Sequence, residues 1–349
     1  MTKKTLFAAT TAACGFAVLA WGPAGNALAQ KKAEPSVSMT ASGASFPELI
    51  YKKWFSDYNK LHPGIQINYQ GGGSGQGIKD LTAGTVDFAA SDRPLSDKEL
   101  ADAKQPMYFP TVLGAIVIAY NLPTVKQPLK MTSDVVAEIF LGKITKWNDK
   151  VLADLNPGVK LPSDDITVVH RTDSSGTTAV FTHYLSKVSG EWQKAVGEGQ
   201  SVKWPTGLGQ AQNPGVAGAI KNSEGACGYV EMTYVVDPNL RGNLQMALLK
   251  NKSGNYVAAS VASATVAGAD AQTFPVDITD SPQKDAYPIS TFTYMLIPSK
   301  MADANKRNAL AAFLKWMLTE GQKTAPQLYY APLPKAVLAK DMAQLSKLQ

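Results

Sequence analysis

The sequence predicts an α/β protein of two domains with largely parallel strands. Short apolar runs with the period of strands alternate with amphipathic runs with the period of helices, and this order is typical of parallel sheets. The chain has 349 residues. The part that remains after an expected leader is removed is too long for a single hydrophobic core. Neither internal repeats nor low-complexity segments interrupt the alternation.

The first 29 residues have the three regions of a secretory signal peptide. Lys3 and Lys4 precede an apolar run over residues 6–21, and an Ala-Leu-Ala sequence ends at Ala29. The apolar run is shorter than the ~20 residues that span a bilayer, which disfavours the alternative of an uncleaved anchor. We therefore predict cleavage after Ala29 and a mature protein outside the cytoplasm.

Composition excludes some classes of partner. The formal net charge is +6, and Lys3 and Lys4 supply two of these charges. The other basic residues are scattered, and no basic run carries interleaved aromatic residues, so nucleic-acid binding is not expected. No cluster of His, Cys and acidic residues has metal-ligand spacing, so we expect neither a metal nor a cofactor.

The elements are predicted in order from the apolar periodicity. Strands are expected over residues 37–41, 65–69, 86–90, 112–120, 166–170 and 289–297. Helices are expected over residues 45–58, 75–81, 133–141, 175–187 and 304–321. Ser45 is predicted as the N-cap of the first helix, and Ser96 with Glu99 forms a capping box that starts another. Residues 257–268 fit neither period.

Three polar turns lead into helices, at residues 42–47, 71–77 and 171–177. A helix N-terminus exposes unpaired N–H groups and carries roughly +0.5 of effective charge, so it suits an anion. Each turn also has an ordinary interpretation: a helix cap at Ser45, a flexible glycine loop, or a surface pair of Arg171 with Asp173. The glycine turn lacks the lysine of a nucleotide P-loop and the last glycine of a nucleophile elbow.

Asp92 follows the strand predicted over residues 86–90. Helix capping explains it poorly because Ser96 already caps the next helix, while a pair with the adjacent Arg93 remains an alternative. The carboxyl end of a strand is where open α/β sheets bind ligands. Asp92 is therefore a candidate binding residue.

Seven runs, taken together and in order, resemble the phosphate-binding receptor of the bacterial high-affinity phosphate ABC transporter. They are residues 43–47, 69–74, 86–92, 141–149, 171–177, 202–205 and 228–231. The resemblance covers nearly all of the chain after the signal. It implies a periplasmic-binding-protein fold of type II, in which two lobes, each a mostly parallel sheet flanked by helices, are joined by two crossing segments.

The resemblance also implies boundaries and ligands. Residues 30–36 are then a leader, residues 37–113 and 288–349 form lobe I, and residues 114–287 form lobe II. The implied phosphate ligands are Ser45, the Phe46 backbone N–H, Ser74, Asp92, Arg171, Ser175, Gly176 and Thr177, with Asp173 holding Arg171 in place. Two positions depart from the common pattern, since Ser45 stands where Thr is frequent and Ser174 where Gly is frequent.

A carboxylate in an anion site suggests a means of selection. Ionised Asp92 only accepts hydrogen bonds, and phosphate near neutral pH still has a proton to donate, whereas sulfate has none. A site built around a required hydrogen bond rejects a ligand that lacks it by ~10⁴–10⁵-fold. Our hypothesis is that Asp92 accepts the phosphate proton and excludes sulfate.

The expected partners are inorganic phosphate and the permease subunits of a phosphate ABC transporter. We expect the protein to be a periplasmic monomer and to have no catalytic residues. A receptor for another oxyanion is one alternative. An exported phosphatase is another, but a serine nucleophile needs a base. Only His62, His170 and His183 are available, and His170 should point away from Arg171 on an alternating strand. The segment Lys143–Asn148 is interpreted as a packed turn, with a docking or hinge role as the alternative.

Overall fold

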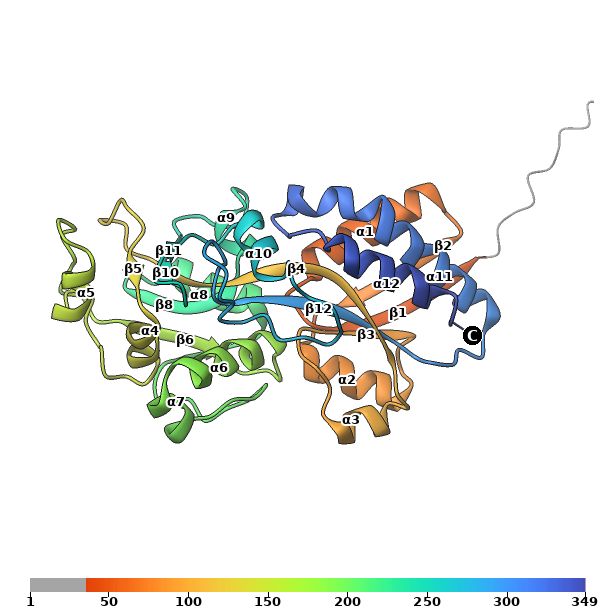
Figure 1. Ribbon diagram of the computed structural model, residues 1–349, viewed down its shortest axis with the longest axis horizontal. Helices are drawn as coiled ribbons and strands as arrows, with labels where there is room; N and C mark the ends of the chain where they lie inside the picture. The colour runs from red at the N-terminus through yellow and green to blue at the C-terminus, as the bar shows by residue number, and fades with distance from the viewer. Residues whose placement is uncertain (1–35, 349) are drawn as a thin grey trace, which may run out of the picture. The chain divides into compact units, whose positions relative to one another are not determined.

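The structure of the protein, a computed structural model, describes residues 36–348 (Figure 1). The predictions of a signal peptide and of cleavage after Ala29 fall outside this range, as does all but the last residue of the leader. Among the described residues, no helix combines the length and the apolar character needed to cross a membrane.

Nine strands form one mixed sheet. In spatial order they are β2 (Ile65–Gln70), β1 (Val37–Gly43), β3 (Phe88–Ser91), β12 (Ser290–Ile297), β4 (Met107–Tyr120), β8 (Ala226–Glu231), β6 (Thr167–Arg171) and β7 (Leu208–Gln210), with β9 (Gln245–Met246) paired to β4. A small second sheet contains β11 (Tyr256–Val257), β10 (Leu248–Lys250) and β5 (Lys130–Met131).

The sheet has a parallel part at each end and antiparallel pairs between them. β1 is parallel to β2 and β3, and β6 is parallel to β7 and β8. The long strand β4 pairs antiparallel with β12 over its first part and with β8 over its last part. β4 and β12 lie side by side and connect the two lobes (Figure 1). The lobe boundaries at residues 113 and 288 stay a prediction.

Helices flank both parts of the sheet. They are α1 (Glu48–Leu61), α2 (Ser74–Ala83), α3 (Asp97–Asp102), α4 (Ser133–Phe140), α5 (Lys150–Leu155), α6 (Gly176–Val188), α7 (Gly190–Ala195), α8 (Gln212–Asn222), α9 (Thr233–Val236), α10 (Val261–Ala267), α11 (Ala304–Thr319) and α12 (Lys335–Leu345), with a 3₁₀ helix over Gly321–Leu328. α2 packs on β1 and β3, and α8 packs on β6 and β8. The predicted strands and helices are confirmed to within a few residues at their ends, and the α/β class is confirmed with them.

Two local predictions have different outcomes. The capping box of Ser96 and Glu99 is confirmed at the start of α3. The N-cap at Ser45 is wrong, because α1 begins at Glu48 after Pro47 and has no side-chain cap. Ser45 Oγ instead accepts hydrogen bonds from Asn213 on α8. A distant partner therefore competes successfully with local capping, which contributes only about 1 kcal/mol.

The structure resolves the form of two segments that the sequence left open, residues 257–268 and the Lys143–Asn148 segment. Residues 257–268 contain α10, whose N-cap Ser260 forms a capping box with Ser263. In the Lys143–Asn148 segment, Trp147 is buried and its indole N–H donates to the Gly225 carbonyl at 2.9 Å. Lys143 forms an ion pair with Glu191, and Lys146 forms one with Asp165. These contacts are those of a packed turn.

Candidate anion-binding site

The predicted ligands lie together at the carboxyl ends of strands and the N-termini of helices. Ser45 and Phe46 follow β1, and Asp92 directly follows β3. The remaining residues are Arg171 at the end of β6, Ser74 at the start of α2, and Ser175, Gly176 and Thr177 at the start of α6. Each polar side chain in the set is at most 3% exposed.

The first turn of α2 contacts the turn before α6. Gly75 N donates to Ser174 O at 2.9 Å. A Cβ atom placed on Gly176 would lie 2.2 Å from Ser74 Oγ and 2.8 Å from Asp92 Oδ2. Position 176 therefore needs glycine, because only a bare backbone lets α6 approach these two side chains so closely.

Four hydroxyl groups of the set act as acceptors towards the protein. The bonds run from Asp92 N to Ser74 Oγ at 3.2 Å, from Thr178 N to Ser175 Oγ at 3.0 Å, from Asn213 Nδ2 to Thr177 Oγ1 at 3.2 Å, and from Asn213 N and Nδ2 to Ser45 Oγ at 3.2 Å each. A hydroxyl has one hydrogen to donate and two lone pairs. Using the oxygen as an acceptor leaves that hydrogen for a ligand oxygen.

Arg171 supplies the positive charge of the site. Its Nε donates to Asp173 Oδ1 at 2.7 Å, and its Nη2 donates to Asp173 Oδ2. The Arg171 side chain is only 1% exposed, so the interpretation as a surface pair is wrong. Burial raises the pKa of Asp173, but Arg171 and the N–H of Gln212 outweigh it and hold that pKa below its usual value. Arg171 Nη1 is buried without a hydrogen-bond partner among the described residues.

Asp92 has one oxygen satisfied and one unsatisfied. Thr293 Oγ1 donates to its Oδ1 at 2.8 Å, whereas its Oδ2 is buried without a partner among the described residues. Burial raises the pKa of this carboxyl to about 7, although Thr293 and Arg171 act in the opposite direction. In its ionised form, Asp92 can accept a hydrogen bond at Oδ2 from a protonated ligand.

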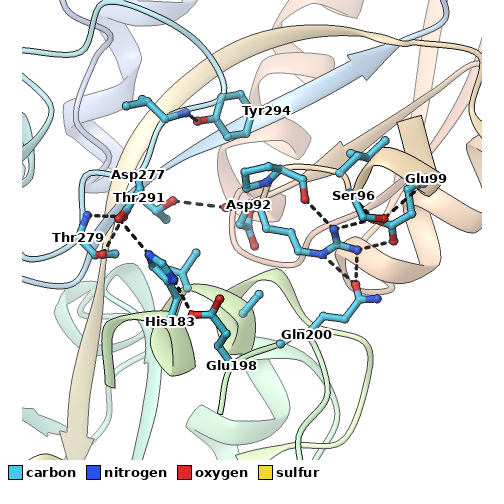
Figure 2. Close-up of a pocket in the computed structure, with 17 residues that line it drawn as sticks. Asp92, Ser96, Glu99, His183, Glu198, Gln200, Asp277, Thr279, Thr291 and Tyr294 are labelled. Carbon is cyan, nitrogen blue, oxygen red and sulfur yellow. Dashed lines mark hydrogen bonds and ion pairs between the residues drawn. The ribbon is translucent and has the colours of Figure 1, made fainter. Parts of the chain in front are cut away.

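Arg93 does not pair with Asp92, so that alternative is wrong. Its Nη2 lies 2.6 Å from Glu99 Oε1, and its Nε donates to Gln200 Oε1 at 3.0 Å. These residues border a cavity of about 560 Å³ that reaches Asp92, and Figure 2 shows Glu99 and Gln200 on one side of it. On the other side, His183 contacts Glu198 and Asp277. The cavity shares Asp92 with the site, but the other predicted ligands do not line it.

The chemistry of the set suits a small oxyanion that carries a proton. Hydroxyl donors, one guanidinium and the N-termini of α2 and α6 provide donors and positive potential. One carboxylate oxygen provides an acceptor. No side-chain group among residues 36–348 has the composition and grouping of a metal site.

Comparison with known proteins identifies the family. The model of the PBP superfamily domain matches residues 29–320. A protein of Xylella fastidiosa named phosphate-binding protein PstS is 41% identical over 305 residues, covering 86% of this chain and 82% of the relative. Proteins of the same name are 41% identical in Haemophilus influenzae, covering 88% and 92%, and 38% identical in Methanocaldococcus jannaschii, covering 86% and 83%. This chain belongs to the PstS family of phosphate-binding proteins.

Solved structures confirm the two-lobed fold of this family member. A phosphate-binding protein from Stenotrophomonas maltophilia matches with a TM-score of 0.70 at 20% identity, covering 88% of this chain and 94% of that one. A phosphate ABC transporter substrate-binding protein from Clostridium perfringens matches with a TM-score of 0.61 at 17% identity, covering 85% and 100%. The family resemblance and the type II fold predicted from the seven sequence runs are therefore confirmed.

The histidines offer no base to the serines of this PstS-family site. The His170 ring stacks on Trp204, with centroids 4.9 Å apart and an interplanar angle of 13°. Its Nδ1 contacts the Arg171 carbonyl rather than a hydroxyl. His183 contacts two carboxylates, and His62 caps the C-terminus of α1. The relatives are named as binding proteins, and this chain is a receptor rather than an enzyme.

Sequence reasoning missed two residues that support the site. Asn213 contacts two of the predicted hydroxyls, and Thr293 holds Asp92. Asn213 lies in the first turn of α8 and belongs to no recognised motif, so the sequence around it did not indicate a role in binding. Thr293 did have one, because it is a polar residue in a strand predicted to be buried, where a hydroxyl needs a partner.

A fully buried acid, Glu231, lies behind the site. Tyr330 Oη donates to the Phe46 carbonyl at 2.7 Å and to Glu231 Oε2 at 3.3 Å, so its hydrogen is shared between two acceptors. Burial raises the pKa of Glu231 from 4.5 to about 8, although the hydrogen bonds from Thr233 and Tyr330 act in the opposite direction.

Glu231 should make folding pH-dependent. Because its pKa is raised in the folded state, its stabilising contribution is complete below pH 4.5 and is lost as the pH rises through about 8. In the wild type, the free energy of unfolding should therefore decline by on the order of a few kcal/mol as the pH rises. We expect Glu231→Gln to lack this decline. Urea unfolding without added anion, between pH 5 and 8, measures it. The exposed Glu224→Gln is the matched control, and an unchanged slope in Glu231→Gln would refute the assignment.

Proposed function

We propose that this chain binds one inorganic phosphate ion between its lobes and delivers it to the permease of a phosphate ABC importer. The observation that carries the proposal is the pair of unsatisfied buried atoms, the acceptor Asp92 Oδ2 and the donor Arg171 Nη1. Hydrogenphosphate has both an oxygen to accept from the guanidinium and a proton to donate to the carboxylate. The names of the PstS relatives point to the same ion.

The ligands proposed are those named from the resemblance: Ser45, Phe46 N–H, Ser74, Asp92, Arg171, Ser175, Gly176 and Thr177, with Asp173 as support. The positive charge of Arg171 and of the helix N-termini is smaller than the combined negative charge of the ion, Asp92 and Asp173. Directed hydrogen bonds must therefore supply most of the binding energy. In the proposed division, Ser45, Ser74 and Asp92 belong to lobe I (37–113 and 288–349). The others belong to lobe II (114–287), so closing the lobes completes the site.

The cellular setting is part of the proposal. A signal peptide cleaved after Ala29 would release the receptor into the periplasm, in keeping with its family. It would act there as a monomer that meets permease subunits with its ligand enclosed. Release of the ion then follows from opening the lobes, since each lobe alone supplies only part of the hydrogen bonds.

Calorimetry tests the function directly. We expect one phosphate ion per chain and a dissociation constant below about 1 μM, which corresponds to a binding free energy of more than about 8 kcal/mol. Mass spectrometry of the purified protein should detect phosphate as the bound ion. Titration with sulfate and molybdate separates the alternative of another oxyanion. A chromogenic phosphate ester separates the enzyme alternative, because saturable hydrolysis would contradict a pure receptor. Tighter binding of sulfate or molybdate than of phosphate would refute the proposal.

A further inference from the structure

Asn213 lies at the centre of the site, although no resemblance assigns it a role. It is fully buried in the first turn of α8. Its Nδ2 donates to Ser45 Oγ and to Thr177 Oγ1 at 3.2 Å each, and its backbone N donates to Ser45 Oγ at 3.2 Å. One amide therefore joins hydroxyls that follow β1 and that begin α6.

The direction of these hydrogen bonds is fixed by the surroundings. Asn213 Oδ1 accepts from the backbone N–H of Glu231 at 3.1 Å, so the oxygen of the amide faces β8 and the NH₂ group must face the hydroxyls. Both hydrogens of Nδ2 are then used, one for each hydroxyl. A flipped amide would place its NH₂ against another N–H donor, and such an arrangement leaves buried groups unpaired.

Hydrogen counting shows what this does to Ser45. Its oxygen accepts two hydrogen bonds from Asn213, so both of its lone pairs are occupied. Its single hydrogen can only be donated elsewhere. Thr177 Oγ1 accepts one hydrogen bond from the same amide. Asn213 thus turns two hydroxyls, which could otherwise accept or donate, into donors.

The backbone around Asn213 is held by the anchor of the site. The preceding residue, Gln212, has a φ of 60°, a left-handed conformation that residues other than glycine rarely adopt. Its N–H donates to Asp173 Oδ1 at 2.9 Å, the same oxygen that accepts from Arg171 Nε at 2.7 Å. The position of Asn213 is therefore coupled to the guanidinium through one carboxylate.

We propose that Asn213 is a positioning residue for anion binding, which aligns the Ser45 and Thr177 hydroxyls as donors and links the two lobes at the ligand. The inference rests on the proposed binding of phosphate. It predicts that the contribution of Asn213 to affinity passes through the hydroxyls of Ser45 and Thr177. A purely structural role would weaken binding to the same degree with or without those hydroxyls.

A mutant cycle of Asn213→Ala against the pair Ser45→Ala, Thr177→Val tests this, with phosphate affinity measured by calorimetry on the full chain. We expect Asn213→Ala to weaken binding by roughly tenfold in the wild-type background and by less than about twofold in the Ser45→Ala, Thr177→Val background. Asn156→Ala is the matched control, since Asn156 is also buried but bonds the Lys130 backbone in the small sheet. It should leave phosphate affinity unchanged.

A second variant keeps the test decisive if alanine prevents folding. Asn213→Asp has nearly the same shape and can still accept from Glu231 N–H, but its carboxylate draws the two hydroxyl hydrogens away from the ligand. We expect a loss of more than about tenfold, most of which disappears in the Ser45→Ala, Thr177→Val background. Losses that simply multiply in both cycles overturn the inference while wild-type binding still supports the phosphate receptor. Absence of phosphate binding by the wild type overturns both.

Discussion

Replacing Asp92 with asparagine is expected to remove most of the discrimination between phosphate and sulfate. In the wild type, sulfate has no proton for the unpartnered Asp92 Oδ2 and would place a second negative charge beside it. The side-chain amide of asparagine can donate to either anion. The loss of a required buried hydrogen bond corresponds to ~10⁴–10⁵-fold in selectivity, so the ratio of the two affinities should fall by a large part of that factor.

Calorimetric titration of wild type and Asp92→Asn with phosphate and with sulfate measures the ratio. Thr293→Val is a graded companion, because it removes only the hydrogen bond to Asp92 Oδ1 and should reduce selectivity less. Wild-type discrimination retained by Asp92→Asn would show that the carboxylate does not select the ion. Phosphate selectivity would then have to come from the shape of the donor set.

Replacing Arg171 with methionine is expected to weaken phosphate binding by roughly 10²–10³-fold. Removing one partner of a buried charged pair costs about 2–5 kcal/mol, and Arg171 is the only guanidinium among the predicted ligands. The loss has two sources, since the anion loses a donor and Asp173 keeps a charge without its partner. Arg171→Lys should lie between wild type and methionine, because an ammonium cannot reproduce the two-pronged bond to Asp173.

The double variant Arg171→Met, Asp173→Asn separates the two sources. If repulsion from Asp173 contributes, the double variant binds phosphate more tightly than Arg171→Met alone. Affinities come from calorimetry, and thermal unfolding of each ligand-free variant shows that the chain is folded. An affinity for Arg171→Met within tenfold of the wild type would contradict the role of Arg171 as the anchor.

The strands and most helices could be predicted from the sequence because their burial follows a short period. Met39 and Ile67 are buried in strands whose alternation predicted that, and Phe313 and Met317 are buried on α11 as the helical spacing indicated. The capping box at Ser96 was predictable for the same reason, since all of its partners lie within one turn. Errors arose where the partner is distant in sequence, as at Ser45.

The candidate site divides in the same way. The seven family runs indicated the predicted ligands, and their place beside strand ends and helix starts gave a physical reason for an anion. Nothing in the sequence indicated that Asn213 contacts Ser45, which is 168 positions away, or that Glu231 is buried against Tyr330, 99 positions away. Such hydrogen bonds depend on which side chains the sheet order places together.

By itself, the sequence determined the α/β class, the order of elements, the expected export signal and the family. Periodicity, turn chemistry and contiguous motifs are local, and local patterns survive in a linear chain. Only the tertiary structure decided that Ser45 is an acceptor for Asn213 instead of a helix cap, and that one oxygen of Asp92 and one nitrogen of Arg171 are left for a ligand. The reason is that burial and hydrogen-bond satisfaction are properties of neighbours in space, and β1, β3, β6 and α8 become neighbours only when the sheet forms.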